Sequence, residues 1–183
     1  ESLEVRRDTT VALIATDREA DLPQAVRIPI TAQEYFLLEN RQQRGNRGVP
    51  SGLDSPLLDS TTVWIDPGQA EFSGGDGTGV WLGVEEYDAF IPGSGMLIWH
   101  VDEEVIRQNL PGGGINNDPV RPGIVLEEAD GYRDIGNLVF NRLREIEGAP
   151  GDPFYQGWKT SFGVDTHPDS RSNAGLESGI HIE

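Results

Sequence analysis

The chain has 183 residues, a formal net charge of −17 and no cysteine. This length suffices for one domain that buries its own core. The lack of cysteine excludes disulfides, thiolate metal sites and cysteine nucleophiles. So negative a chain disfavours nucleic acid and anionic membrane surfaces as partners, because both bind clustered Lys and Arg. No apolar run approaches the roughly 20 residues of a membrane span.

Short segments rich in Val, Ile, Thr and aromatic residues, bounded by Gly, Pro and polar residues, predict β-strands. In chain order the predicted strands are 9–15, 24–30, 34–42, 61–65, 96–102, 123–130 and a last strand at 178–183. Two short helices are predicted, one over 101–110 with Asp102 as N-cap and one over 134–148. We therefore expect a mainly β fold, an antiparallel β-sandwich-like domain with one or two short helices.

Three segments without a strand pattern, 43–60, 66–79 and 163–179, are predicted to be long loops. We expect one β-rich domain over 1–183. In it, 1–23 is a linker or first strand region from a preceding domain, and 163–183 is an extended tail that ends in a strand. Because the chain starts at Glu1 without a methionine, we expect a fragment or a processed product.

The motifs of the common catalytic classes are missing. None of the three histidines, at 100, 167 and 181, belongs to a His-Glu-x-x-His motif. There is also no Gly-x-Ser-x-Gly elbow, no phosphate-binding P-loop and no complete EF-hand loop. We therefore predict no catalytic residue in this chain.

Three predicted strands change from apolar to acidic residues towards their C-terminal ends. In 96–102 the alternation of side chains places His100 and Asp102 on one face, at the rim of the core. In 34–42 and 123–130 the strands also run into carboxylates. If the three strands are neighbours, their ends form one polar layer, which comprises Glu39, His100, Asp102, Glu127 and Glu128.

Two interpretations of this polar layer stay open. One is a buried hydrogen-bonded network of Glu39, Arg41 and His100, for example a Glu39–Arg41 pair or a Glu–His100 pair, that satisfies buried polar groups. The other is a calcium site, because calcium prefers six to eight oxygen ligands and tolerates irregular geometry. The predicted calcium ligands are Asp102, Glu127, Glu128, Asp130 and Asp134, with Asn137 and the loop 116–118 as further oxygen donors.

Three segments together carry a family resemblance: "EYFLLENRQ" at 34–42, "PGSGMLIWHVD" at 92–102 and "LEEADG" at 126–131. Their succession resembles the region that follows the catalytic domain in M6 metallopeptidases, the immune inhibitor A family of secreted zinc proteases. The resemblance covers the chain from about Val26 to its end. It implies a β-rich extracellular accessory domain that packs behind a protease domain, in a family that often uses structural calcium.

The zinc-binding His-Glu-x-x-His helix of that family does not occur in this chain. No catalytic residue is therefore carried over, and zinc is expected only in a catalytic domain outside it. We expect a non-catalytic accessory domain whose partners are the adjacent peptidase domain and an extracellular protein or glycan surface. The alternatives are a stand-alone extracellular binding or surface-layer module, and a carboxylate-based hydrolase that uses Glu39, Glu127 or Glu128.

Overall fold

The computed structural model describes residues 2–16, 21–42, 63–66, 80–84, 88, 91, 93–133, 135 and 148–183. The chain divides into two units, one made of Glu1–Gln42 with Pro92–Glu183 and the other of Gln43–Ile91. The first unit carries all of the sites described below. The expectation of a single domain over 1–183 stays a prediction.

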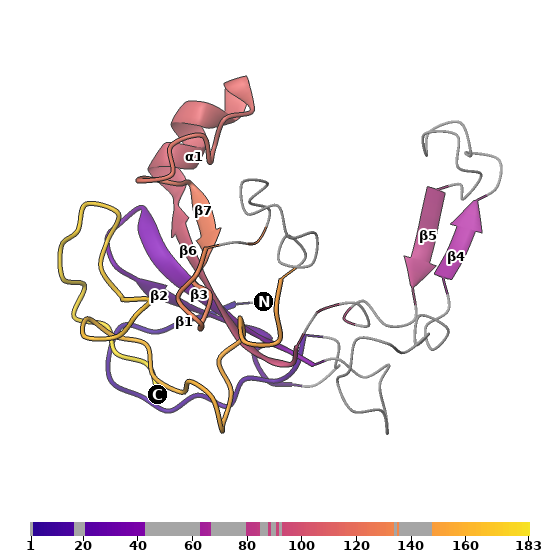
Figure 1. The fold of residues 1–183 in the computed structure, drawn as a ribbon, viewed down its shortest axis with the longest axis horizontal. Coiled ribbons are helices and arrows are strands. Elements are labelled where there is room, and N and C mark those ends of the chain that lie inside the picture. Colours follow the sequence, from indigo (N-terminus) through magenta and orange to yellow (C-terminus); the bar gives the residue numbers. More distant parts are fainter. Residues whose placement is uncertain are drawn as a thin grey trace. The chain divides into compact units, whose positions relative to one another are not determined.

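A five-stranded sheet forms the centre of the first unit, with the strand order β1-β2-β3-β6-β7 (Figure 1). Its strands are β1 Ser2–Glu4, β2 Ala25–Pro29, β3 Glu34–Arg41, β6 Gly95–Asp102 and β7 Ile124–Leu126. β1 runs parallel to β2, whereas the other neighbouring pairs are antiparallel. The fold is thus mainly β, as predicted. The sheet is mixed and open, and the described residues of this unit form no second sheet that would complete a sandwich.

Most of the predicted strands are present. The segments 24–30, 34–42 and 96–102 form β2, β3 and β6, and 123–130 is reduced to the three residues of β7. The segment 61–65 corresponds to β4 (Val63–Asp66), which pairs antiparallel with β5 (Val80–Val84) in the second unit. β5 was not predicted as a strand, and the exposed β1 lies within 1–23, which was expected to be a linker or a first strand region.

Two predicted strands, 9–15 and 178–183, are wrong for the same reason. In 9–15, Val11 and Leu13 pack against the core, but the segment forms a single bridge, between Ala15 and Asn40. The last segment, 178–183, likewise forms one bridge, between Phe162 and Ile182. An alternating apolar pattern is satisfied by packing alone, so it does not ensure a hydrogen-bonded ladder.

The helix predicted over 101–110 is confirmed as α1 (Glu103–Asn109), followed by the 3-10 turn η3 (Leu110–Gly112). Asp102 caps α1 as predicted, because its side chain accepts from the backbone N–H groups of Glu104 and Val105, each at 3.1 Å. Gly113 ends the turn in the left-handed region, at φ 67°. The second predicted helix, over 134–148, falls almost entirely outside the described residues, as do the loops 43–60 and 67–79. Of the helices described, none is long and apolar enough to cross a membrane.

The hydrophobic core lies on one face of the sheet, beneath the C-terminal segment 148–183 (Figure 1). Phe36 of β3 meets Phe162 of this segment edge to face, with ring centroids 5.0 Å apart. Both rings are fully buried, which stabilises the fold by roughly 2 kcal/mol each. The buried core residues are Val26, Phe36, Leu38, Ile98, Ala129, Phe154 and Phe162.

The C-terminal segment is held on the sheet by a close backbone approach. Met96 and Phe154 exchange two N–H···O bonds of 2.9 Å. An ideal Cβ on Gly95 would lie 2.7 Å from the Phe154 carbonyl oxygen, so this approach requires glycine. Residues 163–183, expected as an extended tail, fold back on this face through the bridges Phe162–Ile182 and Gly163–Asp169.

Candidate functional site

A buried histidine lies between two carboxylates at the centre of the first unit. His100 of β6 is 4% exposed. Its Nε2 lies 2.8 Å from Oε1 of Glu34 on β3, and its Nδ1 lies 3.4 Å from Oε1 of Glu127, which follows β7. Both glutamates are buried as well. These three side chains are the centre of what we call the His100 network.

Strand register explains why these three side chains meet. His100 is paired with Phe36 on β3 and with Val125 on β7. Because side chains alternate along a strand, Glu34 shares the face of Phe36, and Glu127 continues the face of Val125. All three therefore point into the core side of the sheet, where the Phe36 ring packs 4.7 Å from the imidazole.

The His100 network favours the charged form of its histidine. Burial by itself disfavours the imidazolium and lowers the pKa of His100. The hydrogen bonds and charges of Glu127 and Glu34 outweigh this effect, so the pKa is raised above its ordinary value of 6.5. Arg133 adds a second cation, since its Nη2 lies 2.8 and 3.1 Å from the two carboxylate oxygens of Glu127. The two carboxylates thus face the imidazole of His100 and the guanidinium of Arg133.

Asp102 forms a second arm of the network. Besides capping α1, its Oδ2 accepts from Nε and Nη2 of Arg121, at 3.2 and 3.0 Å, and from Nδ2 of Asn173 at 3.3 Å. The backbone N–H of Asn173 donates to Glu34 Oε1. Burial alone would raise the pKa of Asp102, but the hydrogen bonds from Val105, Asn173 and Arg121 lower it below its ordinary value of 3.8. Asn173 therefore joins the two arms.

Three carboxylates converge a few residues beyond Glu127. Oxygens of Glu128, Asp130 and Asp152 all lie within 4.8 Å of one another. Glu128 and Asp152 are buried, and Asp130 is partly buried. The N–H of Ala129 donates to the Asp152 carbonyl at 2.8 Å, which brings the two loops together. Carboxylate oxygens in such a group are suitable ligands for a hard cation such as calcium. We call these three residues the acidic group.

The residues predicted as calcium ligands are divided between the His100 network and the acidic group. Glu128 and Asp130 belong to the acidic group. Asp102 and Glu127 instead form ion pairs with arginines, and Asp134 lies outside the described residues. Asp152 was not predicted, because the "GDPF" segment indicates a turn and gives no sign that it folds against 127–131.

The polar layer predicted at three strand ends does not form as one layer. The Glu39–Arg41 pair is present, with Nε 3.3 Å from Oε2, and the Trp99 indole donates to Glu39 at 2.8 Å. Glu39, however, is paired in register with Leu97 and lies on the face opposite His100. Because β3 and β6 are antiparallel, the end of one strand lies beside the start of the other.

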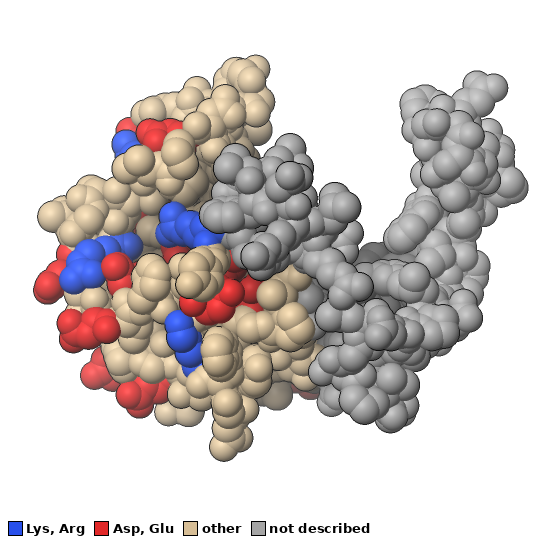
Figure 2. Space-filling view, in the orientation of Figure 1, with Lys and Arg blue, Asp and Glu red and all other residues tan. Residues whose placement is uncertain are grey.

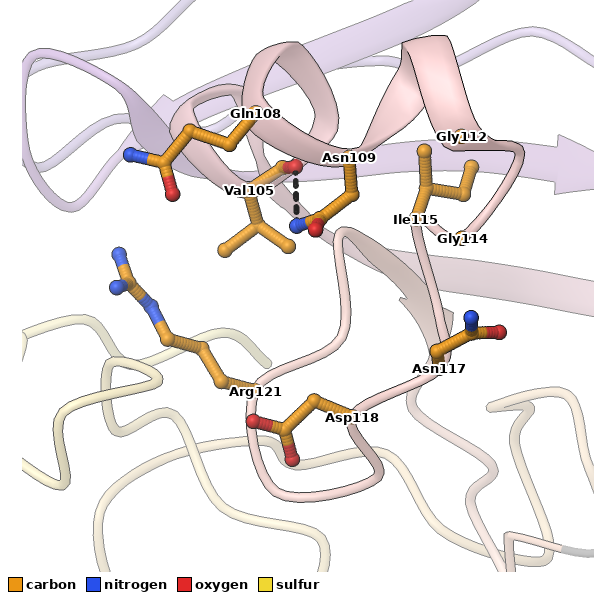
Figure 3. Close-up of a pocket in the computed structure, with 9 residues that line it drawn as sticks. All are labelled: Val105, Gln108, Asn109, Gly112, Gly114, Ile115, Asn117, Asp118 and Arg121. Atoms are coloured by element: carbon orange, nitrogen blue, oxygen red, sulfur yellow. Dashed lines mark hydrogen bonds between the residues drawn. The ribbon is translucent and has the colours of Figure 1, made fainter.

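Two pockets lined by described residues stand out in the first unit. One, of about 340 Å³, has His100 and Glu127 at its wall together with Arg133, His167 and Arg171. The other, of about 410 Å³, lies beside α1 (Figure 3). On the face drawn in Figure 2, basic side chains form separate small patches among carboxylates.

The chain matches no protein-family model, no curated protein and no solved structure. The resemblance to M6 metallopeptidases therefore depends on the sequence motifs alone. The function is therefore inferred from the geometry of the His100 network, the acidic group and the two pockets.

Proposed function

We propose that this chain is a non-catalytic, β-rich accessory domain of a secreted, extracellular M6-like zinc metallopeptidase, which stabilises the catalytic domain or binds a surface. One observation carries the proposal. Two motifs of the resemblance lie on the adjacent strands β3 and β6, and the third begins at the last residue of the neighbouring β7 and continues into the turn that follows it. Because these motifs lie on neighbouring core strands and the adjoining turn, the resemblance involves the whole fold rather than one short loop. The sandwich-like packing expected from the sequence belongs to the same proposal.

The His100 network supports a structural role. Both ring nitrogens of His100 face carboxylates, Glu34 also accepts from the Asn173 backbone, and Glu127 also binds Arg133. A general base needs a lone pair that reaches the substrate proton. In this arrangement both ring nitrogens of His100 already face buried carboxylates of the protein, so the network fixes the register of three strands instead.

The proposal includes one structural calcium ion, held by the acidic group of Glu128, Asp130 and Asp152. Their converging oxygens and partial burial are the observation that favours calcium. The ion would join the turn at 148–153 to the end of β7. Zinc is proposed only for the catalytic domain, outside this chain.

The direct test is the coding sequence upstream of Glu1. A His-Glu-x-x-His motif there, peptidase activity of the full-length protein and no activity of residues 1–183 would support the proposal. An upstream sequence without this motif would remove the protease function. The stand-alone extracellular binding module would then be the better candidate, and the pocket beside α1 is the observation that favours it.

A carboxylate-based hydrolase is the third candidate. Its test is hydrolysis of casein and of soluble polysaccharides by the purified chain, with the variant Glu127→Gln alongside. Since Glu127 is bound by both Arg133 and His100, we expect no hydrolysis by either protein. Turnover that disappears in Glu127→Gln would establish the hydrolase instead.

A further inference from the structure

A polar pocket of about 410 Å³ lies between α1 and the loop that follows it. Val105 and Gln108 of the helix face Asp118 and Arg121 of the loop across its opening (Figure 3). This volume is in the lower part of the range of about 300–1,000 Å³ that small-molecule sites occupy. The pocket favours the binding module named above, and its lining indicates which class of ligand it takes.

The loop that forms one wall is firmly held. Asn116 Oδ1 accepts from the backbone N–H groups of Gly123 and Ile124, at 3.1 and 3.0 Å, which ties the loop to the start of β7. The Gly123 N–H also donates to the Ile115 carbonyl at 2.8 Å, and the Gly114 N–H donates to Asn109. A wall that is already ordered lowers the entropy cost of binding a ligand.

The lining offers hydrogen-bonding atoms that have no partner among the residues that the structure describes. Gln108 and Asn109 donate through their NH₂ groups to Glu104 and the Val105 carbonyl, and this leaves both amide oxygens as acceptors. Asp118 accepts from the Val120 N–H through Oδ1, so Oδ2 stays available. Arg121 binds Asp102 through Nε and Nη2, and its Nη1 has no partner among the described residues.

We propose that this pocket binds a neutral saccharide. Each sugar hydroxyl both donates and accepts, so neighbouring hydroxyls match planar amide, carboxylate and guanidinium groups that present donors and acceptors side by side. The charge of Arg121 is taken up by Asp102, and the chain as a whole carries −17, so an anionic ligand is disfavoured.

A peptide is a less suitable ligand for this pocket. Peptide side chains are anchored chiefly in apolar pockets, whereas Val105 and Ile115 are the only large apolar side chains in this lining. The inference gives a ligand class to the surface-binding part of the proposed function and rests on that part alone. It does not depend on a catalytic domain upstream.

The test is titration of the chain with cellobiose, maltose and N,N′-diacetylchitobiose, followed by NMR of the side-chain amides of Gln108 and Asn109. Gly112 lines the pocket and an ideal Cβ on it meets no atom within 4 Å, so Gly112→Phe introduces a ring at the pocket wall. We expect Gly112→Phe to weaken binding at least about tenfold. The exposed Gln156 gives a control, Gln156→Ala, that leaves binding unchanged.

Three results would overturn the inference. They are no amide shift with any disaccharide up to about 10 mM, saccharide binding that persists in Gly112→Phe, and binding of a tripeptide amide in place of the sugars. The upstream His-Glu-x-x-His search is a separate measurement. A failed titration therefore does not affect the proposed relation to M6 metallopeptidases, and a missing motif does not affect the proposed saccharide site.

Discussion

His100 Nε2 and Glu34 Oε1 are hydrogen-bonded at 2.8 Å across two neighbouring antiparallel strands. The pair is buried, and Glu127 faces the other ring nitrogen. A charged group in this position is tolerated because each charge has an opposite partner. The arrangement therefore links β3, β6 and the end of β7. Removing one of these side chains leaves the others buried without a partner, which lowers the free energy of unfolding.

The first prediction concerns the loss of stability when His100 is removed from this arrangement. His100→Leu leaves Glu34 and Glu127 buried without the imidazole that both face, so the free energy of unfolding should fall by about 3–5 kcal/mol. Denaturant unfolding measures it. His181 is exposed and pairs with Glu183 at the surface, so the control His181→Leu should change the value by less than about 0.5 kcal/mol. Equal small effects in both variants would contradict a structural network.

The second prediction is a loss of stability with rising pH. The folded-state pKa of His100 is raised above 6.5. Its contribution to stability is therefore complete below pH 6.5 and is lost as the pH rises through the folded-state pKa. Unfolding free energies measured from pH 6 to 9 should decline in the wild type. His100→Gln should remove that part of the slope, and an unchanged slope in this variant would assign it to other groups.

Local features of this fold were predictable because they depend on neighbouring residues. The strands 34–42 and 96–102 follow from short runs of aliphatic and aromatic residues, and the N-cap role of Asp102 follows from its place before Glu103 and Glu104. Such signals involve residues within one turn or one strand.

The site was predicted only in part, because strand direction and long-range contacts decide it. Glu39 was placed with His100, but the antiparallel pairing of β3 with β6 puts it beside Leu97 on the opposite face. Asn173 contacts Asp102 although 71 positions separate them in the sequence, and no local pattern predicts such a contact. The sequence pattern does not indicate Glu34, because this residue lies at the start of its strand and the change from apolar to acidic residues lies at strand ends.

The third prediction separates the two functions of Asp102. Asp102→Asn keeps a side-chain oxygen for capping α1, whereas Asp102→Ala removes the cap and should cost about 1 kcal/mol more. The folded-state pKa of Asp102 is lowered below 3.8, so its charge stabilises the fold above pH 3.8 and this effect is lost as the pH falls through the folded-state pKa. Both variants should therefore show a shallower loss of stability on acidification, measured by unfolding between pH 5 and 2. A slope equal to that of the wild type would contradict this.

The fourth prediction concerns the acidic group. If Glu128, Asp130 and Asp152 hold calcium, free calcium at about 100 times its Kd should raise the free energy of unfolding by about 2.7 kcal/mol, and a chelator should reverse the gain. Asp130→Asn should lose this response. Asp165→Asn removes the same charge from an exposed position outside the group, so its response should persist.

This pair of variants separates a bound ion from the screening of a negative surface. An equal calcium response in both would mean that diffuse charge, not the acidic group, produces the effect. Elemental analysis of the desalted chain gives the stoichiometry, for which we expect about one calcium per molecule. Stoichiometric zinc in the same analysis would instead contradict the proposal that zinc is confined to a separate catalytic domain, because carboxylates and histidine are also zinc ligands.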